Sequence, residues 1–409
     1  MASIMRFLSL PIFSAIALAG LLGTGNVSAQ DKATLDLLVK KGLITRPEAD
    51  SLLATPQAPA LTVTAKTPST TTIKIGGYVQ GGYDWVRYKP STGVKHANYN
   101  GFQLNRVILS IAAYLGENWC VFVTPEFDNL RQGDRNYLSD AGVKWDSHAY
   151  GAATVGLRKV DFALEEYSPT TLSKTIMNSP ITNYFISGLG FGSRHVGVYW
   201  DGNLGENFTY GAALTNSDQD QVRANDGNNK PSFWTSLAYT AKDGDLSLRA
   251  GLNLGWQRDD TGRDTATQAF GITETFGYNP YVKISSGKLS LTGEMLGAYL
   301  ASDTHRRALP YGFNALAAYQ FNDWFEPVLR ASWASTNNSQ TLSPNQTRNS
   351  PADGEGFNSA WAIYSGANFY ATEAIKFSAG YEFTRYREGD AGTGHADNHA
   401  IRTQIQAIF

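Results

Sequence analysis

The chain has 409 residues, with 34 basic and 36 acidic side chains and a formal net charge of −2. This balance argues against a nucleic-acid-binding protein, which usually carries a basic excess. The one cysteine, Cys120, excludes a disulfide framework within the chain and a cysteine-rich metal site. The 40 glycines and 12 % aromatic residues, without long apolar runs, are typical of strands that show one face to lipid and the other to water.

Residues 1–29 have the features of a secretory signal peptide. Arg6 is followed by an apolar run over residues 7–22, and residues 27–29 place small side chains before a cleavage point. We therefore expect the mature chain to begin near Gln30 with 33 basic and 36 acidic residues, because the removed segment contains Arg6 and no acid. Beyond that point no run approaches the ~20 apolar residues of a membrane-spanning helix.

The rest of the chain divides into three parts. Residues 30–54 predict two short periplasmic helices, the second opening with a capping box at Thr45-Arg46-Pro47-Glu48. Residues 55–71 are rich in Thr, Pro and Ala and predict a linker. From Thr72 to the end of the chain the hydrophobic period is two, which predicts strands over residues 72–409.

The alternation is clearest in residues 246–256, where one face is apolar and the other polar or small. The apolar face holds Leu246, Leu248, Ala250, Leu252, Leu254 and Trp256. Residues 73–85, 311–321 and 375–383 repeat this pattern. A soluble β-sandwich would alternate in the same way, so the spacing of the turns has to distinguish the two.

Short and long breaks between the strands follow one another in turn. The seven short breaks are residues 116–118, 146–152, 201–206, 243–245, 286–287, 322–323 and 372–373. The eight long ones are residues 89–100, 129–136, 163–193, 216–231, 258–270, 301–310, 336–356 and 388–398. Seven short turns and eight long loops require sixteen strands, and this alternation is characteristic of a membrane barrel. The predicted fold is all-β, a sixteen-stranded antiparallel transmembrane β-barrel with a short N-terminal helical segment.

Aromatic and proline positions refine this prediction. Seven tryptophans fall near predicted strand ends, where interfacial girdles sit, namely Trp85, Trp119, Trp145, Trp200, Trp256, Trp324 and Trp333. Phe409 ends an alternating strand and looks like the signal read by the barrel assembly machinery. Pro125 and Pro327 each remove a ladder hydrogen bond, so we expect both near a rim or a bulge.

Four motifs, in this order, make the sequence resemble the phosphate-selective porin O and P family over nearly the whole mature chain. They are residues 38–45 with Glu48-Ala49, residues 102–106, residues 139–141, and residues 156–160 with residues 163–166. In residues 102–106 the family usually carries a pair of arginines, and Asn105 stands here beside Arg106.

The resemblance implies a homotrimer of outer-membrane barrels, each with its third loop folded into the pore. Its partners would be the lipid bilayer, lipopolysaccharide and small hydrophilic solutes that diffuse passively, with a possible preference for anions such as phosphate. The alternative is a non-selective structural porin tethered to peptidoglycan through its N-terminal helices. The third loop, residues 163–193, is the longest of the eight, which suits a constriction.

Strand parity gives a nearly balanced set of charges facing the lumen. The bases are Lys74, Arg106, Arg158, Arg249, Arg330, Lys376 and Arg402, and the acids are Asp84, Glu126, Asp128, Glu294, Glu326 and Glu382. We expect Arg106, Arg158 and Arg249 to line the pore and bias it modestly toward anions, opposed by Glu165 and Glu166 of the third loop. Alternatively, these arginines form salt bridges to wall carboxylates and brace the barrel.

No catalytic, cofactor-binding or metal-binding constellation is predicted. Some outer-membrane barrels are enzymes with a Ser/His pair, and Ser193 and His195 lie close in sequence, but no third partner is identifiable. The prediction is therefore a channel and not an enzyme.

Overall fold

The computed structural model describes residues 61–66, 70–90, 97–127, 138–147, 149–217, 230–258, 272–302, 307–337, 341–350, 356–389 and 394–409. The chain divides into two compact units, Met1–Pro59 and Ala60–Phe409, and every described residue belongs to the second. The predicted signal peptide, the predicted helices of residues 30–54 and the peptidoglycan tether all lie outside the described residues, as does Asp128.

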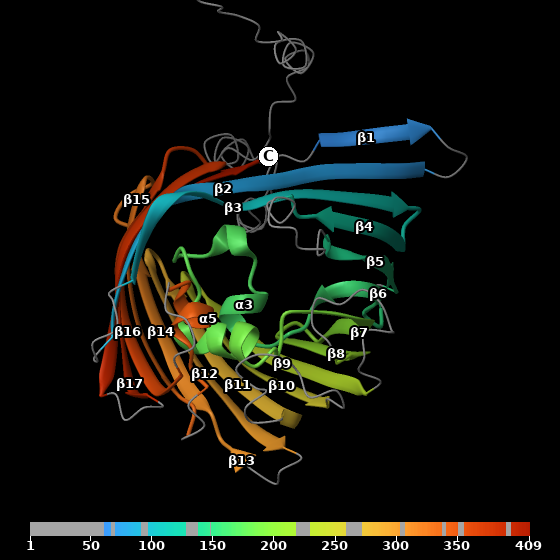
Figure 1. The fold of residues 1–409 in the computed structure, drawn as a ribbon. Helices are drawn as coiled ribbons and strands as arrows, with labels where there is room; N and C mark the ends of the chain where they lie inside the picture. Colours follow the sequence, from blue (N-terminus) through green and yellow to red (C-terminus); the bar gives the residue numbers. More distant parts are fainter. Residues whose placement is uncertain are drawn as a thin grey trace, which may run out of the picture. The chain divides into compact units, whose positions relative to one another are not determined.

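Sixteen antiparallel strands form a closed ring (Figure 1). In chain order they are β2 (Thr70–Pro90), β3 (Ala97–Leu115), β4 (Trp119–Pro125), β5 (Leu138–Asp146), β6 (Ala152–Lys159), β7 (Arg194–Leu204), β8 (Phe208–Asn216), β9 (Pro231–Asp243), β10 (Leu246–Arg258), β11 (Ile272–Ser286), β12 (Leu289–Ser302), β14 (Tyr311–Tyr319), β15 (Phe325–Ser335), β16 (Phe357–Tyr370), β17 (Ile375–Gly389) and β18 (His395–Ile408). The ring closes where β18 pairs with β2, from Tyr78 opposite Ile408 to Pro90 opposite Ala396. The predicted sixteen-stranded barrel is confirmed.

Two further strands extend this ring. β13 (Arg307–Ala308) adds a short second pairing to β12 ahead of β14. β1 (Leu61–Lys66) forms a hairpin with β2, opposite Thr70 to Ile75. The prediction of a linker over residues 55–71 is therefore corrected at residues 61–66. Two physical reasons account for the strand. Its sequence LTVTAK contains three consecutive β-branched residues. In addition, β18 ends at Ile408 and the last backbone pairing, between Phe409 and Gly77, leaves the preceding edge of β2 unpaired by β18.

The connections alternate as predicted. Seven short turns join β3 to β4, β5 to β6, β7 to β8, β9 to β10, β11 to β12, β14 to β15 and β16 to β17. The other connections, most of them longer, gather at the opposite end of the barrel, so the two rims are distinct. We call the two ends of the barrel the short-turn end and the long-loop end.

The wall has an apolar outer face and a polar inner face. On β18, Ile401 and Ile405 are exposed, whereas Arg402, Gln404 and Gln406 are buried in the interior. Aromatic side chains gather toward the rims. Trp119, Trp145 and Trp200 follow one another with ring centroids 6.5 Å apart, and Trp324 stacks on Phe369 beside the turn between β14 and β15. This arrangement suits a wall whose outer surface meets hydrocarbon and whose rims meet the interface.

Both predicted proline positions are confirmed. Pro125 ends β4 at a register shift between Thr124 and Pro125. Pro327 is the third residue of β15, next to the turn that joins β14 to β15, and the ladder between β14 and β15 begins one residue later at Val328. At these positions the missing N–H leaves no gap in the central ladder.

The helices are short and lie within two long loops. The third loop, residues 160–193, contains α3 (Leu164–Tyr167), η2 (Thr170–Leu172), α4 (Pro180–Asn183) and η3 (Tyr184–Gly188). The seventh loop contains α5 (Pro344–Arg348). Among the described residues no helix is long and apolar enough to cross a bilayer. Figure 1 shows α3 and α5 inside the ring of strands.

Candidate functional site in the barrel lumen

The third loop fills one side of the lumen with an apolar cluster. Phe162, Phe185 and Phe191 are fully buried. Phe162 and Phe191, with their rings 4.8 Å apart, pack on Trp234 of β9, and Phe185 packs on both of them. The backbone N–H of Leu164 donates to Asn279 Oδ1 of β11 at 3.1 Å. This burial of large rings holds the loop against β9–β12 and makes it a fixed part of the lumen.

Ion pairs fasten the same loop to the far wall. Arg330 of β15, with 1 % of its surface exposed, donates to Glu165 of α3 at 2.7 Å and to Glu382 of β17 at 2.8 Å. Glu382 also pairs with Arg348 of α5 at 2.6 Å. One buried network therefore joins the third loop, the seventh loop and the wall, with every charged group opposite a partner.

The seventh loop supports the third by hydrogen bonds as well. Asn183 donates to the carbonyl of Thr347 at 3.0 Å, and Arg348 donates to the carbonyl of Asn178 at 2.9 Å. Tyr184 and Thr341 share a hydrogen bond of 2.8 Å. The constriction is thus built from two inward-folded loops, and only the longer one was predicted from the sequence.

The open side of the lumen carries bases that are paired with carboxylates. Lys159 pairs with Glu166 at 2.8 Å, Arg194 with Asp140 at 3.3 Å, and Arg106 more loosely with Glu126 at 3.9 Å. Arg158 forms an ion pair with Asp201, and its guanidinium lies 4.7 Å from the Tyr199 ring. These pairs leave little net charge on this side of the lumen.

Among the described residues, the lumen bases Arg249, Lys283 and Lys74 form neither an ion pair with a carboxylate nor a hydrogen bond to a backbone carbonyl. Arg249 of β10 donates to the hydroxyls of Thr240 and Thr209 at 3.3 and 3.1 Å, and Lys283 of β11 lies directly opposite it. Lys74 lies 5.0 Å from the ring of Tyr114, toward the short-turn end. Two cations on facing positions of neighbouring strands repel each other. Arg249 and Lys283 therefore form a positive patch without an ion-paired carboxylate, with Asp161 and Asp201 on the same cavity as Arg249.

Two carboxylates of the third loop, Asp161 and Glu166, have shifted pKa values. Burial acts to raise the pKa of Glu166, but the Lys159 ammonium and its hydrogen bond outweigh it, so the pKa lies below its ordinary value. Burial raises the pKa of Asp161, although Ser236 donates a 2.8 Å hydrogen bond to its carboxylate. Asp161 therefore gains a proton more readily than an ordinary aspartate.

The seven predicted pore-lining residues have different surroundings. Arg106, Arg158 and Arg249 lie on the open side, the first two paired and the third without a carboxylate. Lys74 lies toward the short-turn end. Arg330 is covered by the third loop and pairs with Glu165, while Glu166 pairs with Lys159. The predicted opposition of Glu165 to the three arginines is not what the structure shows, because Glu165 turns to the other wall.

Lys159, Asp161 and Lys283 were missed by the sequence reasoning. Lys283 follows the inward parity of Tyr281 and could have been found from the alternation of β11. Lys159 and Asp161 lie where β6 gives way to the loop, so no strand parity predicts their direction.

Three polar cavities follow the third loop. One of about 530 Å³ is lined by Asp161, Tyr167, Asp201 and Arg249, and one of about 350 Å³ by Asp140, Arg158, Lys159 and Arg194. The third, of about 330 Å³, lies between the loop and strands β2, β3 and β18. These cavities make up the hydrophilic part of the lumen, next to the apolar cluster of the third loop.

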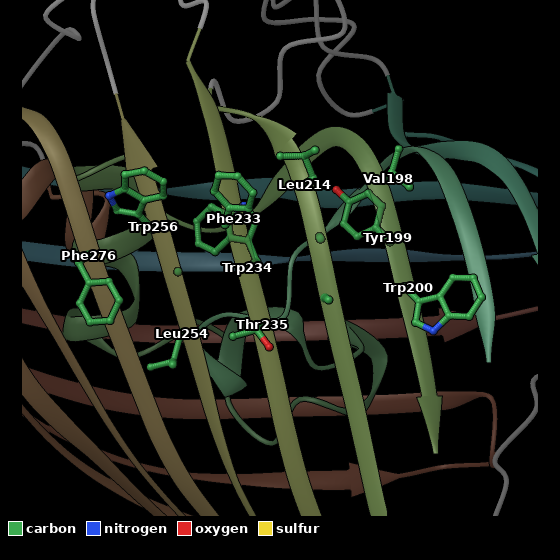
Figure 2. A pocket seen from close by; sticks show the side chains of 13 residues that line it. Val198, Tyr199, Trp200, Leu214, Phe233, Trp234, Thr235, Leu254, Trp256 and Phe276 are labelled. Atoms are coloured by element: carbon green, nitrogen blue, oxygen red, sulfur yellow. The ribbon is translucent and has the colours of Figure 1, made fainter. Parts of the chain in front are cut away.

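A larger hollow, about 670 Å³, lies on the outer face of β7–β11 and not in the lumen. Val198, Leu214, Phe233 and Phe276 on its wall are exposed, and the rings of Phe233 and Trp256 stack 5.6 Å apart (Figure 2). Its lining is almost entirely apolar, as expected for a surface that faces hydrocarbon.

His195, the candidate for a Ser/His pair, is fully buried. Its Nδ1 and Nε2 atoms each lie 2.9 Å from a backbone carbonyl, those of Asn216 and Gly192. Both ring nitrogens are thus engaged with the backbone, which ties β7 to its neighbours and does not position a base for Ser193.

A family model described as phosphate-selective porin O and P matches residues 73–301, more than half of the sequence. The chain belongs to this family. No curated protein matches the sequence. As a member of a porin family with a closed, polar-lined barrel, the protein is an outer-membrane porin that passes small hydrophilic solutes by passive diffusion. The short-turn end is accordingly the periplasmic rim.

Solved structures share the porin's fold at low sequence identity. The outer-membrane channel DcaP of Acinetobacter baumannii aligns at 11 % identity with a TM-score of 0.57, covering 85 % of this chain and 100 % of the other. An anion-selective porin from Comamonas acidovorans aligns at 14 % identity and 0.58, covering 83 % and 100 %. OmpT of Vibrio cholerae in its trimer form aligns at 13 % and 0.52, covering 83 % and 99 %. Family and fold indicate a channel rather than an enzyme.

Proposed function

We propose that this porin has a modest preference for anions, which the patch of Arg249 and Lys283 produces. Every other lumen cation discussed above is neutralised by a carboxylate or held by backbone carbonyls, apart from Lys74 near the periplasmic rim. Guanidinium and ammonium groups that keep their charge replace part of the hydration that an anion loses in a pore. Asp161 opposes them with a charge that burial weakens.

The description of the family as phosphate-selective and the anion selectivity of the Comamonas acidovorans porin both support a preference for anions over cations. Strong selectivity is not expected, because paired charges outnumber unpaired ones along the lumen. The preference should therefore extend to chloride and phosphate alike.

Reversal potentials of the reconstituted channel in a potassium chloride gradient test the proposal. The wild type should show an anion-to-cation permeability ratio above one, and the double variant Arg249→Gln/Lys283→Gln should lower it. Lys288→Gln is the matched control, since Lys288 lies in a periplasmic turn where its ammonium meets the carbonyl of Phe321. Cation preference in the wild type, or an equal effect of the control, would refute the proposal.

We also propose that the barrels assemble as homotrimers in contact with lipopolysaccharide, and that Phe409 is read by the barrel assembly machinery. The trimer form of Vibrio cholerae OmpT supports the first part. The pairing of Phe409 with Gly77 at the barrel seam supports the second, since the terminal residue completes the closing ladder. The mass of the protein–detergent complex tests the trimer, and a monomer in mild detergent would contradict it.

A further inference from the structure

The 330 Å³ cavity between β2, β3, β18 and the third loop differs in chemistry from the rest of the lumen. We call it the amide chamber, after Gln103, Asn105, Asn349 and Gln404 on its lining. None of these four side chains forms a hydrogen bond with any described residue. Gln404 exposes only 9 % of its surface, yet its amide is not enclosed by protein atoms. Unused amide groups therefore converge on one space.

The strand register explains how they converge. Gly82 of β2 lies between Gln103 of β3 on one side and Gln404 of β18 on the other. Cross-strand neighbours share a face, so two amides flank a position with no side chain. Because the β18 backbone approaches Gly82 closely at this point, the two amides lie on either side of a tight contact between strands.

A β-bulge adds the third amide. The β2–β3 register shifts between Gln80 and Gly81, so that Gln80 pairs with Arg106 and Gly81 with Leu104, leaving Asn105 as the extra residue. Bulges re-aim side chains, and Asn105 and Arg106 both line the chamber. Asn349 follows α5 with a left-handed backbone (φ 48°) and closes the chamber from the seventh loop.

The charged side chains that line the amide chamber balance in number, and most of them are already paired or hydrogen-bonded to protein groups. Three bases and three acids line it: Arg106, Lys376 and Arg402 with Asp84, Glu165 and Glu166. Arg402 donates to Asp84 at 3.0 Å, and Lys376 donates to the carbonyl of Ser173 at 2.8 Å. Glu165 and Glu166 are paired with Arg330 and Lys159. Arg106, 3.9 Å from Glu126, is the one lining base that is only loosely paired. The chamber is therefore poorly suited to bind an anion by charge alone.

We propose that the amide chamber is a binding site for an uncharged polyhydroxylated solute of saccharide type. A side-chain amide both donates and accepts hydrogen bonds, which matches a hydroxyl group that does the same. Ile176 and Met177 of the third loop add apolar surface for the C–H faces of a sugar ring. The volume lies at the lower end of the ~300–1,000 Å³ usual for small-molecule sites. This inference rests on the channel function but not on its anion preference.

Sugar-dependent block of the ion current tests it. Maltose and glucose are added to the reconstituted channel, with triethylene glycol as an uncharged solute that reduces current by occupying volume alone. The sugars should reduce the current at concentrations where triethylene glycol does not. The variant Asn105→Ala/Gln404→Met should raise the half-blocking concentration about tenfold, as the loss of two hydrogen bonds implies.

Asn203→Ala is the matched control, since Asn203 is an amide on the 530 Å³ cavity and not on the chamber. Heat-modifiable mobility and an unchanged open-channel conductance establish that each variant folds. Sugar block no stronger than that of triethylene glycol would overturn the proposal. So would stronger binding of phosphate than of sugar, or equal loss in the Asn203→Ala control. Reversal potentials recorded on the same channels report the anion preference separately, so either proposal can fail alone.

Discussion

Arg330 of β15 donates a 2.7 Å hydrogen bond to Glu165 of the third loop, a residue 165 positions earlier in the chain. The same guanidinium holds Glu382, which in turn holds Arg348 of the seventh loop. The position of the constriction thus depends on one arginine that solvent barely reaches.

Replacing Arg330 with Met leaves Glu165 and Glu382 buried with one counter-ion fewer. Breaking a buried ion pair in this way costs about 3–5 kcal/mol, so the free energy of unfolding should fall by that order and the open-channel current should become noisier. Chemical unfolding in detergent measures the first and single-channel recording the second. Arg385→Met is the control, because the Arg385–Asp397 pair is partly exposed and such pairs are worth roughly 0–1 kcal/mol. Equal losses in both variants would contradict the assigned role.

The ion preference should depend on pH through Asp161. Burial raises its pKa above the ordinary 3.8, so on acidification Asp161 takes up a proton earlier than a free aspartate and its negative charge disappears from the neighbourhood of Arg249. The anion-to-cation ratio should therefore rise on acidification, starting at a higher pH than an ordinary aspartate would give, and Asp161→Asn should flatten this dependence. Glu166→Gln should leave the slope intact, since the lowered pKa of Glu166 keeps it ionised throughout. A slope that persists in Asp161→Asn would exclude this carboxyl as the source.

Closure of the barrel should be sensitive to Gly82. A Cβ atom there would lie 1.8 Å from the carbonyl oxygen of Thr403, within the seam between β2 and β18. Gly82→Val should therefore prevent the ladder from closing and remove the compact, heat-modifiable species on electrophoresis. Gly101→Val provides the comparison, because nothing lies within 4 Å of the Cβ built at Gly101. Normal folding of Gly82→Val would contradict this prediction, because it would mean that β2 and β18 can move apart at Gly82 without loss of the barrel.

The positions of the strands could be predicted from the sequence because each strand has one face toward lipid and one toward the aqueous lumen. Apolar residues such as Ile401 and Ile405 alternate with Arg402 and Gln404, and only the parity of the residue determines its side. Loop lengths then give the count of strands. The correction at β1 arose because Pro-rich flanks suggested a linker, while pairing with the unoccupied edge of β2 stabilises a strand there.

Contacts inside the lumen could not be predicted in the same way. That Glu165 turns to Arg330 and Glu166 to Lys159 depends on how the third loop folds, and no period in residues 160–193 encodes it. The inward fold of α5 is equally a tertiary event, since its hydrogen-bonding partners in the third loop, Asn183 and Asn178, lie 164 and 170 positions away in sequence. The bulge at Asn105 depends on the register of β2 against β3, which a single strand does not reveal.

The central claim is that residues 70–409 enclose a water-filled pore in a lipid bilayer. Single-channel recording of the purified protein in a planar bilayer tests it most directly. Discrete, stable conductance steps that scale with salt concentration are predicted. A bilayer whose conductance stays at background although the folded, detergent-solubilised protein has inserted would contradict the account.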